Sequence, residues 1–319
     1  WLLLRWNCIT NRTSMLANGI LFWVPVAVAL RSKDASLVDD CPRPTKYVSH
    51  AAGVGQNLTI ASMFSGYTAM WKFVWENHLH YAAKHQMNYF AVHCHDGFAH
   101  GHFPLRPGQE GLYYSKFAII QYLFDEGADI VFWMDADSMF VDDRRDLRAL
   151  LSEDRDLAFS GDMNVVFNSG HFLLRKSTWS QQFLQDSYAI YPAPDYHENG
   201  AMLAALGGAG LGRLDLVSAA FSQLSRCTVT REEAAAAQAA LPQEVRAHVR
   251  VWEQGAMNSR EDDGRAFILH GAGLPSPLKL AGLAAAEAEQ RRRRKLLRRR
   301  LRRAGEGGGP RAASAKAGG

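Results

Sequence analysis

The feature that most constrains the fold is a run of five apolar residues, Ile130–Met134 (IVFWM), in which both strand faces would be apolar. Such a strand is buried on both sides, as in the middle of a parallel sheet covered by helices. Further short apolar runs occur before and after it, separated by segments with helical periodicity. The chain is therefore predicted to form an α/β domain, with a Rossmann-like mixed sheet flanked by helices.

The expected elements alternate along most of the chain. The expected strands are 58–64, 89–92, 130–134, 157–159, 172–174 and 266–269, and the expected helices are 67–87, 116–124 and 179–190. The Ala- and Gly-rich stretch 201–247 is interpreted as helix and loop. In sheets of this kind, ligands bind at the carboxyl ends of the strands.

The two ends of the chain differ from its centre. Residues 1–30 contain an uncharged apolar run, 15–30, which is interpreted as a signal anchor; a cleaved signal peptide and a buried hairpin are the alternatives. Residues 31–57 are expected to be a stem or linker, and residues 58–280 the folded domain. Residues 281–319 are expected to be a basic, disordered tail.

Charge separates this tail from the rest of the chain. Residues 291–319 hold 12 of the 36 Lys and Arg residues and one of the 32 acidic residues, so the first 290 residues carry a net charge of −7. An acidic body does not bind the phosphate backbone of nucleic acid, and it tolerates cations. The tail cannot form a core, so truncation after Gly282 is expected to leave catalysis intact.

The residues that carry chemistry follow the apolar strand directly. Asp135 and Asp137 flank Ala136 at the strand end, where residues two apart project to the same side. Adjacent carboxylates repel unless a cation neutralises them, so the pair is predicted to hold a divalent cation. His270 directly follows the last expected strand, shortly before Gly273, and imidazole suits Mn²⁺ better than Mg²⁺. The alternatives are an Asp-rich helix-capping turn and a loop histidine without a special role.

Several ordered segments give a more specific indication. They are Asn77-His-Leu-His-Tyr81-Ala-Ala-Lys-His, Tyr114-Ser-Lys116, Trp133-Met-Asp135-Ala-Asp137, Asn168-Ser-Gly170-His-Phe-Leu-Leu-Arg175, Gln254 with Asn258-Ser, and His270-Gly-Ala-Gly273. Over residues 58–275 this set resembles the galactosyl/mannosyl transferase family. That family (glycosyltransferase family 34) contains fungal α-1,2-galactosyltransferases, α-1,6-mannosyltransferase subunits and plant xyloglucan α-1,6-xylosyltransferases. Glu198-Asn199 departs from its Asp-Gln pattern, and Lys279 is the nearest substitute for a lysine expected soon after the final histidine.

The resemblance implies a GT-A fold and a retaining glycosyltransferase. Its donor would be a UDP-sugar or GDP-mannose, its transferred sugar galactose, mannose or xylose, and its acceptor a glycan. It also implies Mn²⁺ or Mg²⁺ on Asp135, Asp137 and His270, and a single-pass type II Golgi membrane protein with a lumenal catalytic domain, alone or in an oligomer. The residues expected to bind donor or cofactor are Ser65, Gly66, Lys116, Asp135, Ala136, Asp137, Asn168, Gly170, His270, Gly273 and Lys279.

Glu198 and Asn199 are the expected catalytic residues. Glu198 would be the nucleophile if retention uses a double displacement, and front-face attack would not need one; as a structural alternative, Glu198 stabilises a helix start. Gly170 is expected to let backbone approach the sugar, or to take a positive φ, so Gly170→Val should abolish transfer without unfolding the protein. Two other functions remain open, a haloacid-dehalogenase-like phosphatase and an inactive subunit with a glycosyltransferase fold.

Overall fold

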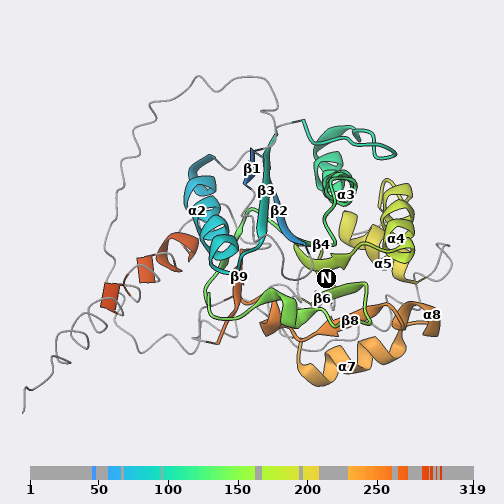
Figure 1. Ribbon diagram of the computed structural model, residues 1–319. Helices are drawn as coiled ribbons and strands as arrows, with labels where there is room; N and C mark the ends of the chain where they lie inside the picture. The colour runs from blue at the N-terminus through green and yellow to red at the C-terminus, as the bar shows by residue number, and fades with distance from the viewer. Residues whose placement is uncertain are drawn as a thin grey trace, which may run out of the picture.

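The computed structural model describes residues 45–47, 57–65, 68–94, 96–161, 167–193, 197–207, 229–260 and 265–271, and parts of 282–296. These residues form a seven-stranded mixed sheet with helices on both faces, and a separate two-stranded sheet beside it (Figure 1). The predicted α/β class, a mixed sheet flanked by helices, is confirmed.

The large sheet has the strand order β1-β3-β2-β4-β7-β6-β8. Its strands are β1 (Thr45–Tyr47), β2 (Leu58–Phe64), β3 (Asn88–His93), β4 (Ile130–Met134), β6 (Leu157–Ser160), β7 (His171–Arg175) and β8 (Val249–Trp252). β2 pairs in parallel with β3 and β4, whereas β7 is antiparallel to β4, with Met134 opposite His171. The carboxyl end of β4 and the start of β7 therefore lie at one edge of the sheet.

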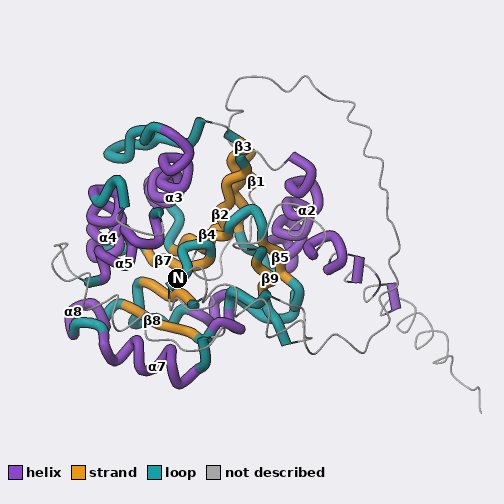
Figure 2. Tube along the Cα trace, turned by 180° about the vertical axis from the view of Figure 1, so that it is seen from behind, coloured by secondary structure: helices purple, strands orange, loops and turns teal. Residues whose placement is uncertain are grey.

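The small sheet consists of β5 (Ser138–Phe140) and β9 (Ile268–His270), which run antiparallel. The longer helices are α2 (Thr68–Lys84), α3 (Gly108–Asp125), α4 (Thr178–Ala189), α5 (Glu198–Leu206) and α7 (Arg231–Ala240). Shorter helical segments are α8 (Gln243–Arg246) and the 3₁₀ turns Leu147–Leu150 and Gln254–Ala256. Viewed from behind, α2 lies with β5 and β9 on one side of the large sheet, and α3, α4 and α5 lie on the other (Figure 2).

The central strand β4 separates two hydrophobic cores. Val131 and Trp133 belong to the core beneath α3, α4 and α5, whereas Ile130, Phe132 and Met134 belong to the core beneath α2. Alternate residues of a strand face opposite sides of the sheet, so a strand between two helical layers must be apolar throughout. This is the reason for the five-residue apolar run.

The folded region is wider than residues 58–280. β1 lies within the expected linker and pairs with β3, so folded chain is present before residue 58. Residues 282–286 are helical, and Leu283 and Ala286 are buried in the core beneath α2. Part of the expected tail therefore belongs to the folded body.

Several expectations fall on residues that the structure does not describe. They concern the apolar run 15–30, the sites Gly66, Gly273 and Lys279, and residues 297–319. Within the described ranges, no helix combines the length and the apolar character that crossing a membrane requires.

Candidate metal centre

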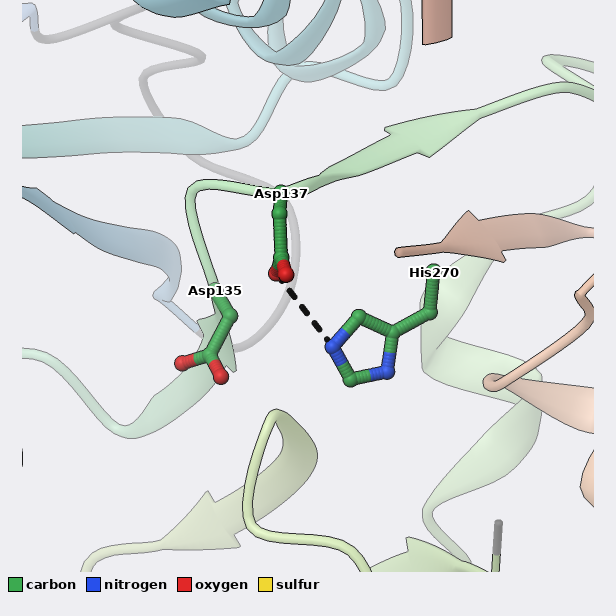
Figure 3. Close-up of side chains that lie close together, drawn as sticks. All are labelled: Asp135, Asp137 and His270. Carbon is green, nitrogen blue, oxygen red and sulfur yellow. Dashed lines mark ion pairs between the residues drawn. The ribbon is translucent and has the colours of Figure 1, made fainter. Parts of the chain in front are cut away.

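Asp135, Asp137 and His270 come together at the edge of the large sheet (Figure 3). One ligand atom from each lies within 4.8 Å of the others. Asp135 follows β4 directly and Asp137 precedes β5. Because β9 pairs with β5, with Ser138 opposite His270, the small sheet brings the imidazole to the carboxylates. His270 Nε2 lies 3.4 Å from Asp137 Oδ1.

Backbone hydrogen bonds fix these three positions. The Asp135 amide donates to the Gly170 carbonyl at 2.9 Å, which ties the end of β4 to the residue before β7. The Gly271 amide donates to the Asp137 carbonyl at 2.9 Å, and the His270 amide donates to the Ser259 carbonyl at 2.8 Å. Rigid backbone of this kind is what a site with defined ligand geometry needs.

The hydrogen-bond network assigns the tautomer of His270. Asn258 Nδ2 donates to the carbonyl and hydroxyl oxygens of Ser160, at 3.3 and 2.8 Å, which orients the amide. Asn258 Oδ1 therefore accepts from His270 Nδ1 at 2.8 Å and from His171 Nδ1 at 2.5 Å. In neutral His270 the Nε2 lone pair then faces the Asp137 carboxylate. Two acceptors facing each other repel, and a metal ion or a proton between them removes the repulsion.

A buried lysine connects this group to α5. Lys116 Nζ lies 2.6 Å from Glu198 Oε1 and 3.8 Å from Asp135 Oδ1. It also donates to the backbone carbonyl and the hydroxyl oxygen of Ser169, at 3.0 and 3.1 Å, and lies 5.3 Å from the centre of the Trp133 ring. The Ser169 hydroxyl donates to the same Glu198 oxygen at 2.6 Å. Lys116 and Glu198 thus form a hydrogen-bonded ion pair beside Asp135.

Acidic side chains outnumber lysines among the described residues of this cluster. Asp135, Asp137 and Glu198 can carry three negative charges, and Lys116 carries one positive charge. Burial raises the pKa of Asp135, and the negative charge of the neighbouring Asp137 raises it further. The positive charge of Lys116 acts in the opposite direction and lowers this pKa, but the net shift is upward. Burial alone would lower the pKa of Lys116, but Asp135 and Glu198 outweigh it and raise that pKa. A group with several carboxylates of this kind suits a divalent cation.

The loop before β7 packs tightly against the same group. Asn168 Oδ1 accepts from the Gly170 amide at 2.7 Å, and Asn199 Oδ1 accepts from the Ser169 amide at 2.5 Å. A Cβ atom on Gly170 would lie 2.6 Å from His270 Cε1 and 3.0 Å from Asp135 Oδ2. Close approach is therefore the reason for glycine at this position; the alternative expectation of a positive φ is not observed.

The structure gathers most of the expected site residues in one place. Those at the cluster are Lys116, Asp135, Ala136, Asp137, Asn168, Gly170, Glu198, Asn199 and His270. Ser65 directly follows β2, the parallel neighbour of β4, and so lies at the same edge of the sheet.

Sequence reasoning gave no role to Ser169 or His171, and it gave Asn258 none beyond its place in a motif. Ser169 and His171 flank Gly170 within the motif Asn168–Arg175. Their contacts, however, come from α3, α5 and the turn that carries Asn258. Sequence spacing does not reveal such long-range contacts.

Comparisons with known proteins find similarity in structure only. No family model and no curated protein matches the chain. A glycosyltransferase involved in the glycosylation of the major capsid of PBCV-1 is 11% identical, covering 70% of this chain and 97% of its own, with a TM-score of 0.47. The glycosyltransferase GlyE of Streptococcus pneumoniae TIGR4 is 12% identical, covering 47% and 43%, with a TM-score of 0.31.

Proposed function

We propose that this chain is a metal-dependent glycosyltransferase, which moves a sugar from a nucleotide-sugar donor to a glycan acceptor. The observation that carries the proposal is the convergence of Asp135, Asp137 and the Nε2 lone pair of His270 at the end of β4. Three protein ligands leave coordination positions for diphosphate oxygens and water. The ordered motifs that resemble the galactosyl/mannosyl transferases support the same reaction.

The residues present fit a divalent cation. Two carboxylates and one imidazole suit Mn²⁺, with Mg²⁺ as the weaker candidate because of the nitrogen ligand. When bound, such an ion stabilises the negative charge that develops on the departing diphosphate. Lys116 holds Asp135 and Glu198 in place through ion pairs. The absence of a side chain at Gly170 leaves room for the His270 and Asp135 side chains.

Glu198 is the proposed catalytic carboxylate. Its hydrogen bonds from Lys116 and Ser169 both end on Oε1, so that oxygen is fixed. In a double displacement, Glu198 would attack the anomeric carbon as the diphosphate leaves. The acceptor hydroxyl oxygen would then displace the Glu198 carboxylate from that carbon, with the hydroxyl proton passing to the departed diphosphate. In front-face attack, the leaving phosphate oxygen takes the acceptor proton and Glu198 helps to orient the sugar. Asn199 is proposed to position the Asn168–Gly170 loop against the donor through its contact with Ser169.

The remaining parts of the proposal rest on the motif resemblance. They are a UDP-sugar or GDP-mannose donor, transfer of galactose, mannose or xylose with retention of configuration, and residence of an anchored, lumenal domain in the Golgi membrane. A homo- or hetero-oligomer belongs to the same group of proposals.

Nucleotide binding tests the proposal directly. Calorimetry with the full chain should show UDP or GDP binding that Mn²⁺ strengthens at least tenfold, together with slow hydrolysis of one nucleotide-sugar. Asp137→Asn should lose the Mn²⁺ effect, whereas Asp154→Asn, a change in an exposed aspartate, should keep it. Metal-independent binding, or an unchanged Asp137→Asn variant, would overturn the proposal.

Two further results would identify the competing functions. Hydrolysis of p-nitrophenyl phosphate without nucleotide binding would indicate a phosphatase. Metal-dependent nucleotide binding without turnover of any nucleotide-sugar, with or without glycans, would indicate an inactive subunit.

A further inference from the structure

Two rings meet near the ion pair of Lys116 and Glu198. Tyr113 of α3 and His197, the residue before α5, have ring centroids 4.9 Å apart at an interplanar angle of 34°. Tyr113 is 39% exposed, and His197 is also exposed. A partly exposed ring beside a site of proposed chemistry is a candidate contact for a ligand.

The ring pair and the ion pair are successive contacts between the same two helices. Tyr113 and Lys116 are three residues apart on α3, so they lie on one helical face. His197 directly precedes Glu198. The Lys116 and Glu198 side chains are only 3% and 7% exposed, so the contacts run from solvent inward to the charged cluster. A molecule resting on Tyr113 and His197 would therefore lie at the outer side of Glu198.

The backbone of His197 is also unusual. Its φ of 54° and ψ of −137° fall where glycine is favoured and a side chain is strained. Glycine would adopt this conformation at lower cost. A histidine here indicates that the imidazole itself has a use, and its ring contacts the ring of Tyr113.

From these observations we infer that Tyr113 and His197 form the platform on which a sugar ring of the glycan acceptor stacks. Pyranose rings present an apolar face of C–H groups, and exposed aromatic rings are suited to cover it. The inference rests on the proposed function, which places the diphosphate at Asp137 and His270. The transferred sugar lies between the diphosphate and the acceptor. Glu198 follows His197 in the chain and is joined to Asp135 through Lys116. The platform is thus on the acceptor side.

Glycan binding, measured separately from nucleotide binding, tests this inference. The full chain, with UDP or GDP and Mn²⁺, would be applied to a printed array of plant, fungal and animal oligosaccharides. Calorimetry with the best-bound oligosaccharide would follow for four variants: Tyr113→Ala, His197→Gly, Tyr113→Phe and Leu105→Ala. Leu105 is the matched control because it is an exposed apolar residue outside the ring pair.

We expect Tyr113→Ala and His197→Gly to weaken oligosaccharide binding about tenfold or more. The affinity for nucleotide with Mn²⁺ should stay at the parent value in both variants. Tyr113→Phe, which keeps a ring, and Leu105→Ala should bind oligosaccharide like the parent. His197→Gly should not lower the melting temperature, because glycine accepts the backbone conformation, so its loss of binding would not be a folding defect.

Three results would overturn the inference. One is full oligosaccharide binding by Tyr113→Ala, and another is the absence of oligosaccharide binding in the parent. The third is weaker nucleotide binding in Tyr113→Ala, which would mark the rings as a platform for the nucleobase. Failure of the proposed function is distinguishable, because it would appear as absent Mn²⁺-dependent nucleotide binding in the parent itself.

Discussion

Asn258 determines which nitrogen of His270 faces Asp137. Its amide oxygen accepts from His270 Nδ1 and His171 Nδ1, and its amide nitrogen donates to the Ser160 hydroxyl oxygen. Contacts behind a metal-binding histidine fix the ring and keep the ligating nitrogen free of a proton. Asn258 is therefore a positioning residue for the proposed metal ion.

Asn258→Ala should weaken Mn²⁺ binding about 10–100-fold, the usual effect of losing such a contact. It should also lower the free energy of unfolding by about 1–3 kcal/mol, because two buried N–H groups lose their acceptor. Calorimetry with UDP at several Mn²⁺ concentrations would measure the first effect, and urea unfolding the second. Asn258→Asp, which keeps an acceptor for both histidines, should retain more of the Mn²⁺ affinity. Equal affinities for Asn258→Ala and the parent would contradict the role of Asn258.

Gly170→Ala should damage the site through crowding. The new Cβ would lie 2.6 Å from His270 Cε1 and 2.7 Å from Asn168 Oδ1, so a proposed metal ligand must shift. We expect at least tenfold weaker Mn²⁺-dependent UDP binding, and overpacking should cost about 1–3 kcal/mol of stability. The second effect revises the sequence-based expectation that a larger residue here would leave the melting temperature nearly unchanged. Gly255→Ala, where the space around the Cβ is open, is the control and should resemble the parent.

At the scale of elements, α2 is fastened to the segment that carries Asp137. His78 Nε2 donates to the Ser138 carbonyl at 2.9 Å, and Asn77 exchanges hydrogen bonds with the Phe140 backbone at 3.0 and 2.8 Å. His78 Nδ1 lies 3.2 Å from the Ser62 hydroxyl. These contacts hold β5 against α2, so the position of Asp137 depends on a neutral, buried His78.

Burial lowers the pKa of His78 from 6.5 to about 4, although the hydrogen bond to Ser138 acts in the opposite direction. As pH falls, the unfolded chain takes up this proton first. Stability that is complete above pH 6.5 is thus lost progressively down to about pH 4, by about 3 kcal/mol at most. Urea unfolding of the parent and of His78→Gln between pH 7 and pH 4 would isolate this contribution. His171, whose pKa burial also lowers, remains in both proteins, so equal slopes for the two would contradict the assignment.

The elements that sequence predicted best are those with strong local patterns. The apolar runs predicted β2 and β4 with their observed bounds. The helix α4 was expected from residue 179 and begins at Thr178, capped by Ser177. The helix α3 begins at Gly108, eight residues before its expected start, because Gly108 and Gly111 are poor helix formers that obscure the boundary. β1, β5 and β8 have three or four residues each, and only pairing with distant partners makes them strands.

The residues of the candidate site also divide into those with a local sequence signal and those without one. Asp135 and Asp137 could be found because an apolar strand delivers them, and His270 because it ends another strand. The links from Lys116 to Glu198 and from Asn258 to His270 join residues 82 and 12 positions apart. Such links depend on how the helices pack over the sheet, which local patterns do not encode.

At the scale of the whole molecule, the boundary between body and tail decides which truncations are tolerated. Leu283 is 1% exposed and Ala286 is 7% exposed, and both pack in the core beneath α2. Beyond them, Arg292 and Glu289 form an exposed ion pair at 3.8 Å, an interaction that contributes little to stability. A truncation after Gly282 would remove these core residues. The cut that leaves the folded body intact therefore lies closer to the C-terminus.

Truncation after Gln290 should leave nucleotide binding within a few-fold of the parent, because it removes the basic segment and keeps Leu283 and Ala286. Truncation after Gly282 should cost about 2–4 kcal/mol of unfolding free energy, since burial of one leucine side chain contributes about 1.5–3 kcal/mol and the alanine methyl adds to it. Leu283→Ala in the full chain should reproduce most of that loss with the basic tail still present. Urea unfolding of the three proteins against the parent measures these differences. If the two truncated chains prove equally stable, the segment that carries Leu283 is no part of the folded body. If the cut after Gln290 abolishes Mn²⁺-dependent UDP binding while the protein stays folded, the basic residues beyond Gln290 contribute to nucleotide binding.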